Sequence, residues 1–362
     1  MKQILYRYIR IITGIVFIFS GFVKMVDPVG TEIKLHEYFS PEVLNLPFLN
    51  PYAMGIGMLF ILLEWTIGWA LIFNFKPKLT LNIALILMTF FLFLTGYSAI
   101  THTVTDCGCF GDAIKLTPRQ TFEKNIVLML LLIYLRFNIY DSGKNLKLKT
   151  TIVGLLSIGA LVLMVWTIRH LPLIDFRPYA VGKNIREGMS IPPDAPKAKF
   201  VNHWYYRIDG KVKEFSDKDQ PWNIPGAEFV KRETEQISEG YIPPIHDFSI
   251  EGDWGDITDK VLDAPEIYII AIPYPQKLTG KDLKQIVKII GFLKKNKKEF
   301  VITTAEITPA LERLTRAVDT PLNITDSTTL KTMIRSRAGI LLLKKASVAG
   351  KWALYDFPVK QP

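Results

Sequence analysis

The two cysteines of this chain lie one residue apart, in the segment Asp106-Cys107-Gly108-Cys109-Phe110-Gly111-Asp112. A disulfide between them would close a small ring through one glycine, near the limit of allowed disulfide geometry, and strain makes such a bond easier to reduce. Labile disulfides are the catalytic or regulatory kind. The spacing therefore favours thiol–disulfide chemistry by Cys107 and Cys109 over simple packing or metal binding.

Acids and one histidine surround the pair. His102 lies five residues before Cys107, where it could assist thiolate formation or complete a metal site with both cysteines and Asp106. A C-x-C motif plus one histidine does not match the usual zinc spacings, so we expect no metal. Asp106 and Asp112 oppose an unusually acidic thiol unless Lys24, Lys115 or His102 offsets them.

Two charged residues lie within predicted membrane segments. Lys24 is near the outer end of the first apolar run, where it could anchor the interface, pair with Asp27 or Asp106, or favour the Cys107 thiolate. Glu64 lies deep in the second run, where a carboxylate is costly unless it is paired, protonated or facing a wet interior. It either accepts a proton beside a quinone or other carrier, or is an uncharged side chain bonded to Thr13 or Thr89.

Composition divides the 362 residues into an apolar first half and a polar, proline-rich second half. The net charge of +10 is not a sign of nucleic-acid binding, because no basic patch interleaves with stacking aromatics and many basic residues flank apolar runs. We therefore expect a lipid bilayer as the environment and no nucleic acid as a partner.

Five apolar runs are near the length that a bilayer requires. Basic residues cluster at the N-terminus, at 74–78 and at 136–149, which places these segments in the cytoplasm. The loops 27–50 and 101–118 and the chain after Arg169 then lie outside, on the oxidising side of a bacterial inner membrane. The predicted spans are 11–26, 51–73, 79–100, 121–140 and 151–168, the first ending at Asp27-Pro28 and the fourth opening with a capping box at 117–120.

The sequence of the second half predicts a segment with β-structure, called the collar below, and then an α/β domain. The collar, 175–240, is rich in proline and aromatic residues and contains a hairpin of 200–208 with 212–215. In the last domain, strand–helix–strand is followed by a helix and a terminal hairpin, which is the thioredoxin-like order. The expected strands are 266–272, 300–304, 322–324 and a hairpin of 339–344 with 352–356; the helices are 280–296, 309–318 and 328–335.

Two separated motifs resemble redox-associated membrane proteins of the MauE/DoxX type. They are the cysteine segment, between the third and fourth spans, and 14–24 followed by Asp27-Pro28 and Gly30. The resemblance covers roughly 5–140 and implies a four-helix membrane bundle linked to thiol or quinone redox work. The whole arrangement looks like the longer DoxX-family proteins of Bacteroidota, which add a fifth span and an extracytoplasmic domain.

The last domain is similar to thioredoxin-fold proteins of the peroxiredoxin and TlpA type, because 245–250 resembles their first strand and 255–259 the turn that follows it. Where a redox thioredoxin carries C-x-x-C, this chain has Pro273-Tyr274-Pro275-Gln276-Lys277, and Arg337-Ala338 replaces the usual proline. A domain without these residues cannot run dithiol chemistry, so we expect it to dock on or shield the membrane cysteines.

These observations predict a four-helix membrane domain (1–140), a cytoplasmic connector and fifth transmembrane helix (141–174), the collar (175–240) and a degenerate thioredoxin-like periplasmic domain (241–362). The expected function is thiol–disulfide exchange by Cys107 and Cys109 with a partner protein or a membrane carrier such as a quinone. The sequence leaves open whether the chain is an oxidoreductase or an accessory subunit of one. The alternatives are a non-catalytic scaffold whose outer domain binds a complex and, resting on Glu64 alone, a transporter-like bundle.

Overall fold

The structure is a computed structural model that describes residues 2–101, 103–104, 108–114, 116–140, 145–238 and 240–359. It divides into two compact units, Met1–Lys183 with Ser249–Pro362, and Asn184–Phe248. His102, Asp106, Cys107 and Lys115 lie outside the described residues, so the expectations that rest on them remain predictions.

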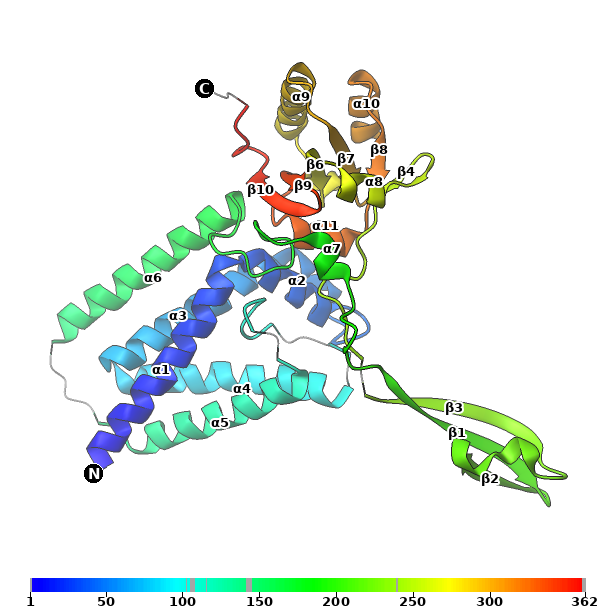
Figure 1. The fold of residues 1–362 in the computed structure, drawn as a ribbon. Helices are drawn as coiled ribbons and strands as arrows, with labels where there is room; N and C mark the ends of the chain where they lie inside the picture. The colour runs from blue at the N-terminus through cyan, green and yellow to red at the C-terminus, as the bar shows by residue number, and fades with distance from the viewer. Residues whose placement is uncertain are drawn as a thin grey trace. The chain divides into compact units, whose positions relative to one another are not determined.

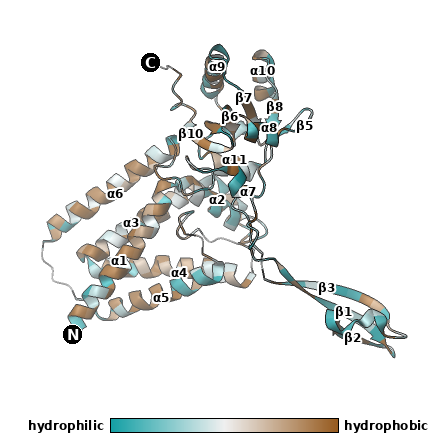
Figure 2. Ribbon diagram, in the orientation of Figure 1, coloured by the Kyte–Doolittle hydropathy of each residue, from teal (hydrophilic) through white to brown (hydrophobic). Residues whose placement is uncertain are grey.

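The first unit begins with a helical bundle (Figure 1). Its helices are α1 (Lys2–Val26), α3 (Ala53–Phe73), α4 (Pro77–Thr101), α5 (Pro118–Phe137) and α6 (Leu146–Arg169). Among the described residues, four helical stretches are long and apolar enough to cross a membrane: α1, α3 with the preceding turn η1 (Pro47–Tyr52), α4 and α6. Figure 2 shows the brown, apolar character of these helices. They correspond to the first, second, third and fifth predicted spans.

The fourth predicted span is helix α5, and its status as a span stays a prediction. The capping box at its start is confirmed, because Thr117 Oγ1 accepts from the Gln120 backbone and the Gln120 side chain accepts from the Thr117 backbone. However, α5 carries Arg119, Glu123 and Lys124 in its first two turns, and it is not among the four apolar stretches. Its buried residues Leu128, Leu132 and Leu135 nevertheless belong to the same core as side chains of α1, α3 and α4.

Helices α1 and α3 approach closely through glycines. A Cβ added to Gly14 would lie 2.9 Å from the backbone oxygen of Gly68, and one added to Gly68 would lie 2.8 Å from the backbone nitrogen of Ile18. Small residues at a helix contact let two backbones pack closely, which is how membrane helices associate without a hydrophobic driving force. This packing holds Lys24 on α1 beside Glu64 on α3, and both charged side chains are buried.

The segment after α1 is a helix, which corrects the expectation of an outside loop over 27–50. Helix α2 (Pro28–Phe39) starts immediately after α1, with the Asp27 side chain accepting from Gly30 N at 3.0 Å and Pro28 at the first helical position. Asp27-Pro28 therefore ends one helix and begins the next, since aspartate is a good N-cap and proline fits the first turn.

The C-terminal part of the first unit is a mixed sheet in the order β10-β9-β6-β7-β8-β4-β5. Strand β6 (Ile267–Ile272) is parallel to β7 (Phe300–Thr304), which is parallel to β8 (Leu322–Ile324). Strand β9 (Gly339–Lys344) is antiparallel to β6 and to β10 (Ser347–Ala353). The helices are α8 (Thr258–Asp263), α9 (Gly280–Lys295), α10 (Pro309–Ala317) and α11 (Ser327–Met333), and two short strands, β4 (Glu251–Gly252) and β5 (Gly255–Asp256), complete the edge.

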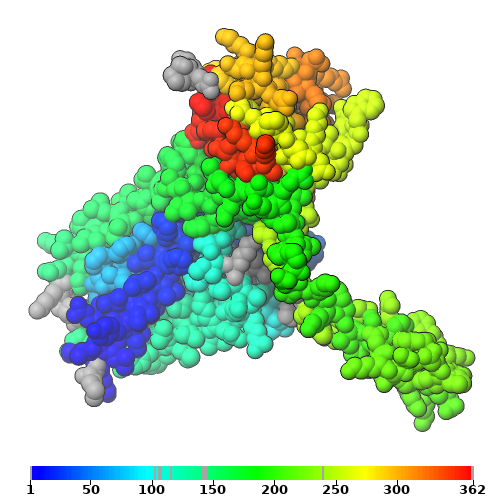
Figure 3. Space-filling model, in the orientation of Figure 1, coloured from blue at the N-terminus to red at the C-terminus, as the bar shows by residue number. Residues whose placement is uncertain are grey.

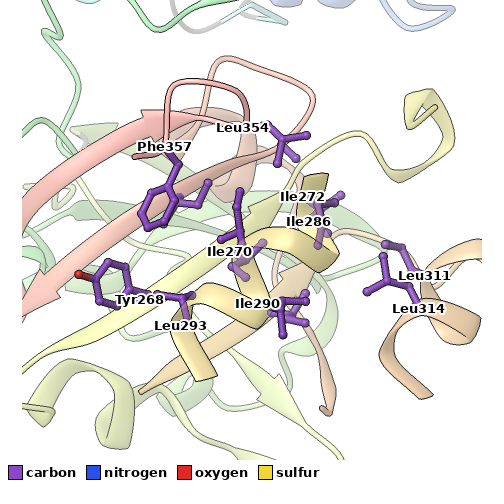
Figure 4. Close-up of a cluster of buried hydrophobic side chains, with 14 residues drawn as sticks. Tyr268, Ile270, Ile272, Ile286, Ile290, Leu293, Leu311, Leu314, Leu354 and Phe357 are labelled. Atoms are coloured by element: carbon purple, nitrogen blue, oxygen red, sulfur yellow. The ribbon is translucent and has the colours of Figure 1, made fainter. Parts of the chain in front are cut away.

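The core of this α/β part lies between the sheet and helices α9 and α10. Figure 4 shows side chains of β6, including Ile270 and Ile272, packed against Ile286 and Ile290 of α9. Six consecutive buried residues in β6 are typical of a central strand covered on both faces. The strands expected at 300–304 and 322–324 are confirmed with their bounds, and the three expected helices are present with ends shifted by up to two residues.

Two expectations for this part were wrong. The closing hairpin turns at Lys345 and Ala346, both with positive φ (47° and 62°), so β10 begins at Ser347 and not at 352. Neither residue is a glycine or asparagine, which is why the turn gives no sequence signal. The stretch 245–250 is not a strand; the short pair β4 and β5 follows it.

Before β6, the segment that follows α6 joins the sheet side of the first unit. Gly182 N donates to Val348 O at 2.8 Å, and Val348 N donates to Lys183 O at 2.9 Å. Figure 3 shows this green segment against the red atoms of β10. The chain is thereby tied to the α/β part directly after it leaves α6.

The second unit is a three-stranded antiparallel sheet, β2-β1-β3, preceded by the short helix α7 (Ile185–Met189). Its strands are β1 (Lys199–Ile208), β2 (Lys211–Ser216) and β3 (Glu228–Ser238). The predicted hairpin is confirmed by the pairing of β1 with β2. Trp204 packs edge-on against Trp222 and Phe229, which gives this otherwise exposed sheet a small aromatic cluster.

Candidate functional site

Cys109 lies in a tight turn that is fastened to helix α1. Gly111 N donates to Gly108 O at 3.0 Å, and both glycines have positive φ (62° at Gly108 and 51° at Gly111), a conformation that favours glycine. Ser20 Oγ donates to the Cys109 carbonyl at 2.8 Å. The turn therefore presents Cys109, half-buried, at a fixed place against α1.

A basic side chain, Lys124 of α5, lies beside this cysteine. Its ammonium group interacts electrostatically with the Cys109 side chain. The same nitrogen lies 4.4 Å from the centroid of the Phe110 ring, which in turn packs edge-on against Phe19 of α1 at 5.3 Å. A cation over an aromatic ring is held by the ring quadrupole, so Phe110 steadies Lys124 beside the cysteine.

Lys24 and Glu64 form a buried ion pair, which corrects the alternatives in which Glu64 is bonded to Thr13 or Thr89 and Lys24 pairs with Asp27. The interpretation of Glu64 as a proton acceptor stays a prediction. Lys24 Nζ lies 2.6 Å from Glu64 Oε1, and their side chains are 9% and 2% exposed. Glu64 is bonded to neither Thr13 nor Thr89, and Lys24 pairs with a residue of α3 and not with Asp27. The second carboxylate oxygen, Glu64 Oε2, is buried and has no hydrogen-bond partner among the described residues.

An inner cavity brings these groups together. It has a volume of about 20 Å³, enough for about one water molecule, and Lys24, Glu64, Cys109 and Lys124 all line it. The four side chains come from α1, α3, the cysteine turn and α5. Three ionisable side chains and one thiol thus meet at one small polar space within the bundle.

An outer cavity of about 320 Å³ lies on the other side of Cys109. Lys24, Phe91 and Cys109 line both cavities, so the cysteine lies in the wall between them. Much of the lining is apolar, including Tyr38, Phe60, Phe91 and Leu94. The volume falls at the lower end of the range for pockets that bind small organic molecules.

Arg335 closes part of the outer cavity and joins the α/β part to the bundle. Its Nε lies 2.8 Å from Asp27 Oδ2, and its Nη2 lies 3.3 Å from Asp112 Oδ2. Burial opposes the charge of the guanidinium, but the two carboxylates outweigh it and hold the pKa of Arg335 above its ordinary value. One side chain therefore holds both the start of α2 and the end of the cysteine turn.

The loop after β6, residues 273–277, lies close to this arginine. Burial, with a smaller contribution from the Glu32 carboxylate, raises the pKa of Tyr274 to about 12, and Arg335 acts in the opposite direction. Lys277 and Lys331 both lie over the Tyr274 ring, with nitrogen-to-centroid distances of 4.8 and 5.6 Å. Tyr274 thus stays a neutral phenol, and this loop offers packing rather than redox chemistry.

A second charged cluster fixes the chain after α6. Asp175 accepts from Arg177 Nε and from Lys351 Nζ, both at 2.7 Å. Burial, and next the positive charge of Arg177, lower the pKa of Lys351 to about 7, while Asp175 acts to raise it. Arg177 also lines the outer cavity, and its Nη2 is buried without a hydrogen-bond partner among the described residues.

Of the predicted site residues, the structure brings together Cys109, Lys24 and Glu64, and it places Asp27 and Asp112 around Arg335. Cys107, Asp106 and His102 lie outside the described ranges, as does most of the metal-site alternative built on them. Sequence reasoning missed Lys124, Arg335 and Arg177. Lys124 gave a usable signal, because a basic residue in a predicted span is as unusual as Glu64; the two arginines gave none.

Comparison with known proteins supports the membrane part of these expectations. Residues 2–137 match the family model described as "Methylamine utilisation protein MauE". The chain is similar to "Protein TlpB" of Flavobacterium psychrophilum, with 31% identity over 132 residues, 36% of this chain. The chain spans about a third of the length of this curated relative, 35%. No solved structure gives a significant match. The helical part is therefore similar to the MauE family of membrane proteins.

Proposed function

We propose that this chain is a bacterial inner-membrane protein that carries out thiol–disulfide exchange through Cys107 and Cys109. The observation that carries the proposal is the position of Cys109 in the wall between the inner cavity, with its buried charges, and the outer cavity. A packing cysteine would be surrounded by apolar side chains, whereas this one lies beside a lysine and faces an accessible space. The match of residues 2–137 to the MauE family model is in keeping with redox-related work at a membrane.

In the proposed reaction, one cysteine of the pair attacks a disulfide of a partner protein as a thiolate. The sulfur–sulfur bond of the partner breaks, its electron pair leaves on the second partner sulfur, and a mixed disulfide forms. The other cysteine then attacks the mixed disulfide and releases the first partner sulfur. The pair loses two electrons and becomes a disulfide, and the partner becomes a dithiol after taking up two protons.

We further propose that the cysteine turn lies on the periplasmic side, with five spans including α5 and a cytoplasmic N-terminus. The basic residues that flank the spans support this orientation. The α/β part would be a degenerate thioredoxin-like domain, since its order β10-β9-β6-β7, with β9 antiparallel to its neighbours, is that of the thioredoxin core. Its contact through Arg335 suggests that it orients the partner over the outer cavity.

The electron carrier on the membrane side would be a quinone in the outer cavity. Phe60, Phe91 and Leu94 offer an apolar wall of the kind that a ring system needs, and Cys109 lines the same space. When bound in its reduced quinol form, such a carrier would supply the two electrons that return the Cys107–Cys109 disulfide to the dithiol. The chain's own residues would hold it next to the cysteine turn and keep bulk water from the thiol.

A non-catalytic scaffold is the second candidate function. It is favoured by one observation: the α/β part has no cysteine in its sequence and reaches the bundle through the buried ion pairs of Arg335. In that case the cysteines would only lock the loop between α4 and α5, and the outer domain would bind a complex.

Thiol trapping separates the two candidates. Cells producing the full-length chain, or its Cys107→Ala or Cys109→Ala variant, are quenched with acid and alkylated, and disulfide-linked partners are identified on non-reducing gels. Exchange predicts that one single variant accumulates a mixed disulfide that reductant releases, and that the double alanine variant captures nothing. A pair that stays in one redox state in all conditions, with no capture by either variant, contradicts exchange and leaves the scaffold. An impermeant thiol reagent checks the periplasmic side independently.

A further inference from the structure

We infer that Cys109 is the cysteine that attacks as a thiolate, and that Lys124 is its charge partner. This inference rests on the proposed function, because it assigns roles within the same C-x-C pair. It goes further by choosing between the two sulfurs, which the sequence leaves equal, and by adding a residue that sequence reasoning did not single out.

The charges around the inner cavity support the assignment. Lys24 and Glu64 are 2.6 Å apart and cancel as a pair. Lys124 lines the same cavity and forms no ion pair with a carboxylate within the described part of the chain. Of the neighbouring groups, the Cys109 sulfur favours its charge most and the Glu64 carboxylate less, while Lys24 opposes it. A buried cation without a counter-charge is costly. A thiolate on Cys109 would leave this group of four side chains electrically neutral, with two cations and two anions.

The geometry holds the two groups together in a defined way. The positive φ of Gly108 and of Gly111 shapes the turn, and the Ser20 hydrogen bond fixes the Cys109 carbonyl. Lys124 comes from the second turn of α5, a helix whose start is set by its capping box. Phe110 lies under the ammonium group at 4.4 Å. Both partners of the proposed thiolate–ammonium contact are therefore positioned before any substrate arrives.

Glu64 provides an independent sign that the inner cavity handles polar chemistry. Its side chain is 2% exposed, and Oε2 has no hydrogen-bond partner in the described part of the chain, although it belongs to a residue that lines the cavity. Buried carboxylate oxygens are nearly always satisfied. The cavity has room for about one water molecule, and such a water could connect Glu64 Oε2 to the thiol or to Lys124.

The order of electron and proton transfer follows from this assignment. The Cys109 thiolate attacks one sulfur of the partner disulfide, and the negative charge leaves with the second partner sulfur. Cys107 then attacks the Cys109 sulfur, which expels the first partner sulfur and closes the Cys107–Cys109 disulfide. Lys124 lacks the thiolate counter-charge until that disulfide is reduced again. The proton of Cys107 is released in that second step. The partner disulfide is the oxidant, and it gains two electrons.

Alkylation of the reduced full-length protein in lipid nanodiscs tests the assignment. Iodoacetamide at pH 7 is small enough to enter the outer cavity, and peptide mapping by mass spectrometry separates the rate at Cys109 from that at Cys107. We expect Cys109 to be labelled first. Lys124→Met should lower its rate about tenfold, because the attacking sulfur then lacks an adjacent cation to stabilise its negative charge, and Lys124→Arg should stay within about threefold of the wild type.

Arg119→Met is the matched control, since Arg119 is on the same helix but is 85% exposed and paired with Glu123. It should leave the Cys109 rate unchanged. Faster labelling of Cys107, an unchanged rate in Lys124→Met, or an equal loss in Lys124→Arg each overturns the assignment. Lys124→Gln replaces the methionine variant if the latter does not fold.

Trapping gives a second, separate result. With Cys109 as the attacking sulfur, Cys107→Ala captures the mixed disulfide and Cys109→Ala does not; the reverse pattern overturns the assignment while leaving exchange intact. If neither variant captures a partner, the proposed function fails, whereas the alkylation rates still decide whether Lys124 activates Cys109.

Discussion

Replacing Arg335 with methionine should release the α/β part from the outer end of the bundle. Methionine keeps much of the side chain's apolar bulk but removes the charge. Arg335 Nε lies 2.8 Å from Asp27 Oδ2 and its Nη2 lies 3.3 Å from Asp112 Oδ2, with side-chain exposures of 8% for the arginine and 18% and 32% for the acids. The first ion pair is both shorter and more buried, so we expect it to contribute more.

The size of the effect follows from two opposing quantities. At an effective dielectric constant of about 20, the two contacts give roughly 6 and 5 kcal/mol of Coulomb attraction. Removing three charged groups from water costs several kcal/mol for each group, which offsets most of this gain. Breaking a buried pair by deleting one partner typically costs about 3–5 kcal/mol. Because both acids keep some solvent contact and Asp27 also caps α2 through Gly30 N, we expect about 3 kcal/mol.

Hydrogen–deuterium exchange of the full-length protein in nanodiscs measures this loss directly. If the contact opens locally, about 3 kcal/mol corresponds to roughly a hundredfold faster exchange. The faster amides should lie in α11 and in the first turns of α2. Double-mutant cycles with Asp27→Asn and Asp112→Asn should give coupling energies of roughly 2 and 1 kcal/mol.

Arg337→Met is the control for this experiment. Arg337 is two residues away and about half exposed, and it pairs with Asp282 inside the α/β part at 3.1 Å. It should affect the start of α9, where Asp282 caps the helix with Thr279, but not α2. Exchange in α2 that is the same in Arg335→Met and in the wild type would refute the conclusion that Arg335 holds the two parts together.

Three further predictions concern stability. Lys351 has a folded-state pKa of about 7 against an ordinary 10.5, so the unfolded chain binds more protons between these values and stability should rise with pH. From pH 7 to 9 we expect the free energy of unfolding, measured with urea, to increase by about 2 kcal/mol. The Lys351→Met variant should not show this increase. Glu64→Met should lower the midpoint of thermal unfolding, because it leaves Lys24 buried and unpaired. The double variant Lys24→Met/Glu64→Met should recover more than half of this loss, and a further loss would contradict the ion pair. Gly68→Ala should cost about 1–3 kcal/mol in the same thermal assay because its Cβ meets backbone atoms of α1, whereas Gly55→Ala, with open space around it, should not destabilise.

Local signals in the sequence predicted much of the fold. The bounds of β7 and β8 and the capping box of α5 were correct, because strand alternation and capping residues act within a few positions. Helix α2 was missed because Asp27-Pro28 is equally suited to end one helix and to begin another. The start of β10 was missed because its turn, Lys345-Ala346, has positive φ without glycine or asparagine.

The candidate site was predicted only in part because its contacts are distant along the chain. The depth of Glu64 in an apolar run shows that it needs a partner, but not which helix supplies one; the partner, Lys24, is 40 positions away. Arg335 and Asp27 are 308 positions apart, and nothing in the local sequence of either links them. Sequence indicates which residues are costly to bury, and packing decides which of them meet.

The position of Arg335 makes the cysteine turn sensitive to what binds the α/β part. Asp112 is three residues after Cys109, and Gly111, between them, packs against Val23 of α1. Loss of the Arg335 contact would therefore leave the turn held mainly by the Ser20 hydrogen bond and by packing on α1. A partner that competes for Arg335 needs to supply only a few kcal/mol to shift this equilibrium, which a single well-placed carboxylate at an interface can do. The exchange experiment tests this link, since amides at 108–114 should become faster together with those of α2 in Arg335→Met, and independent behaviour of the two segments would exclude coupling.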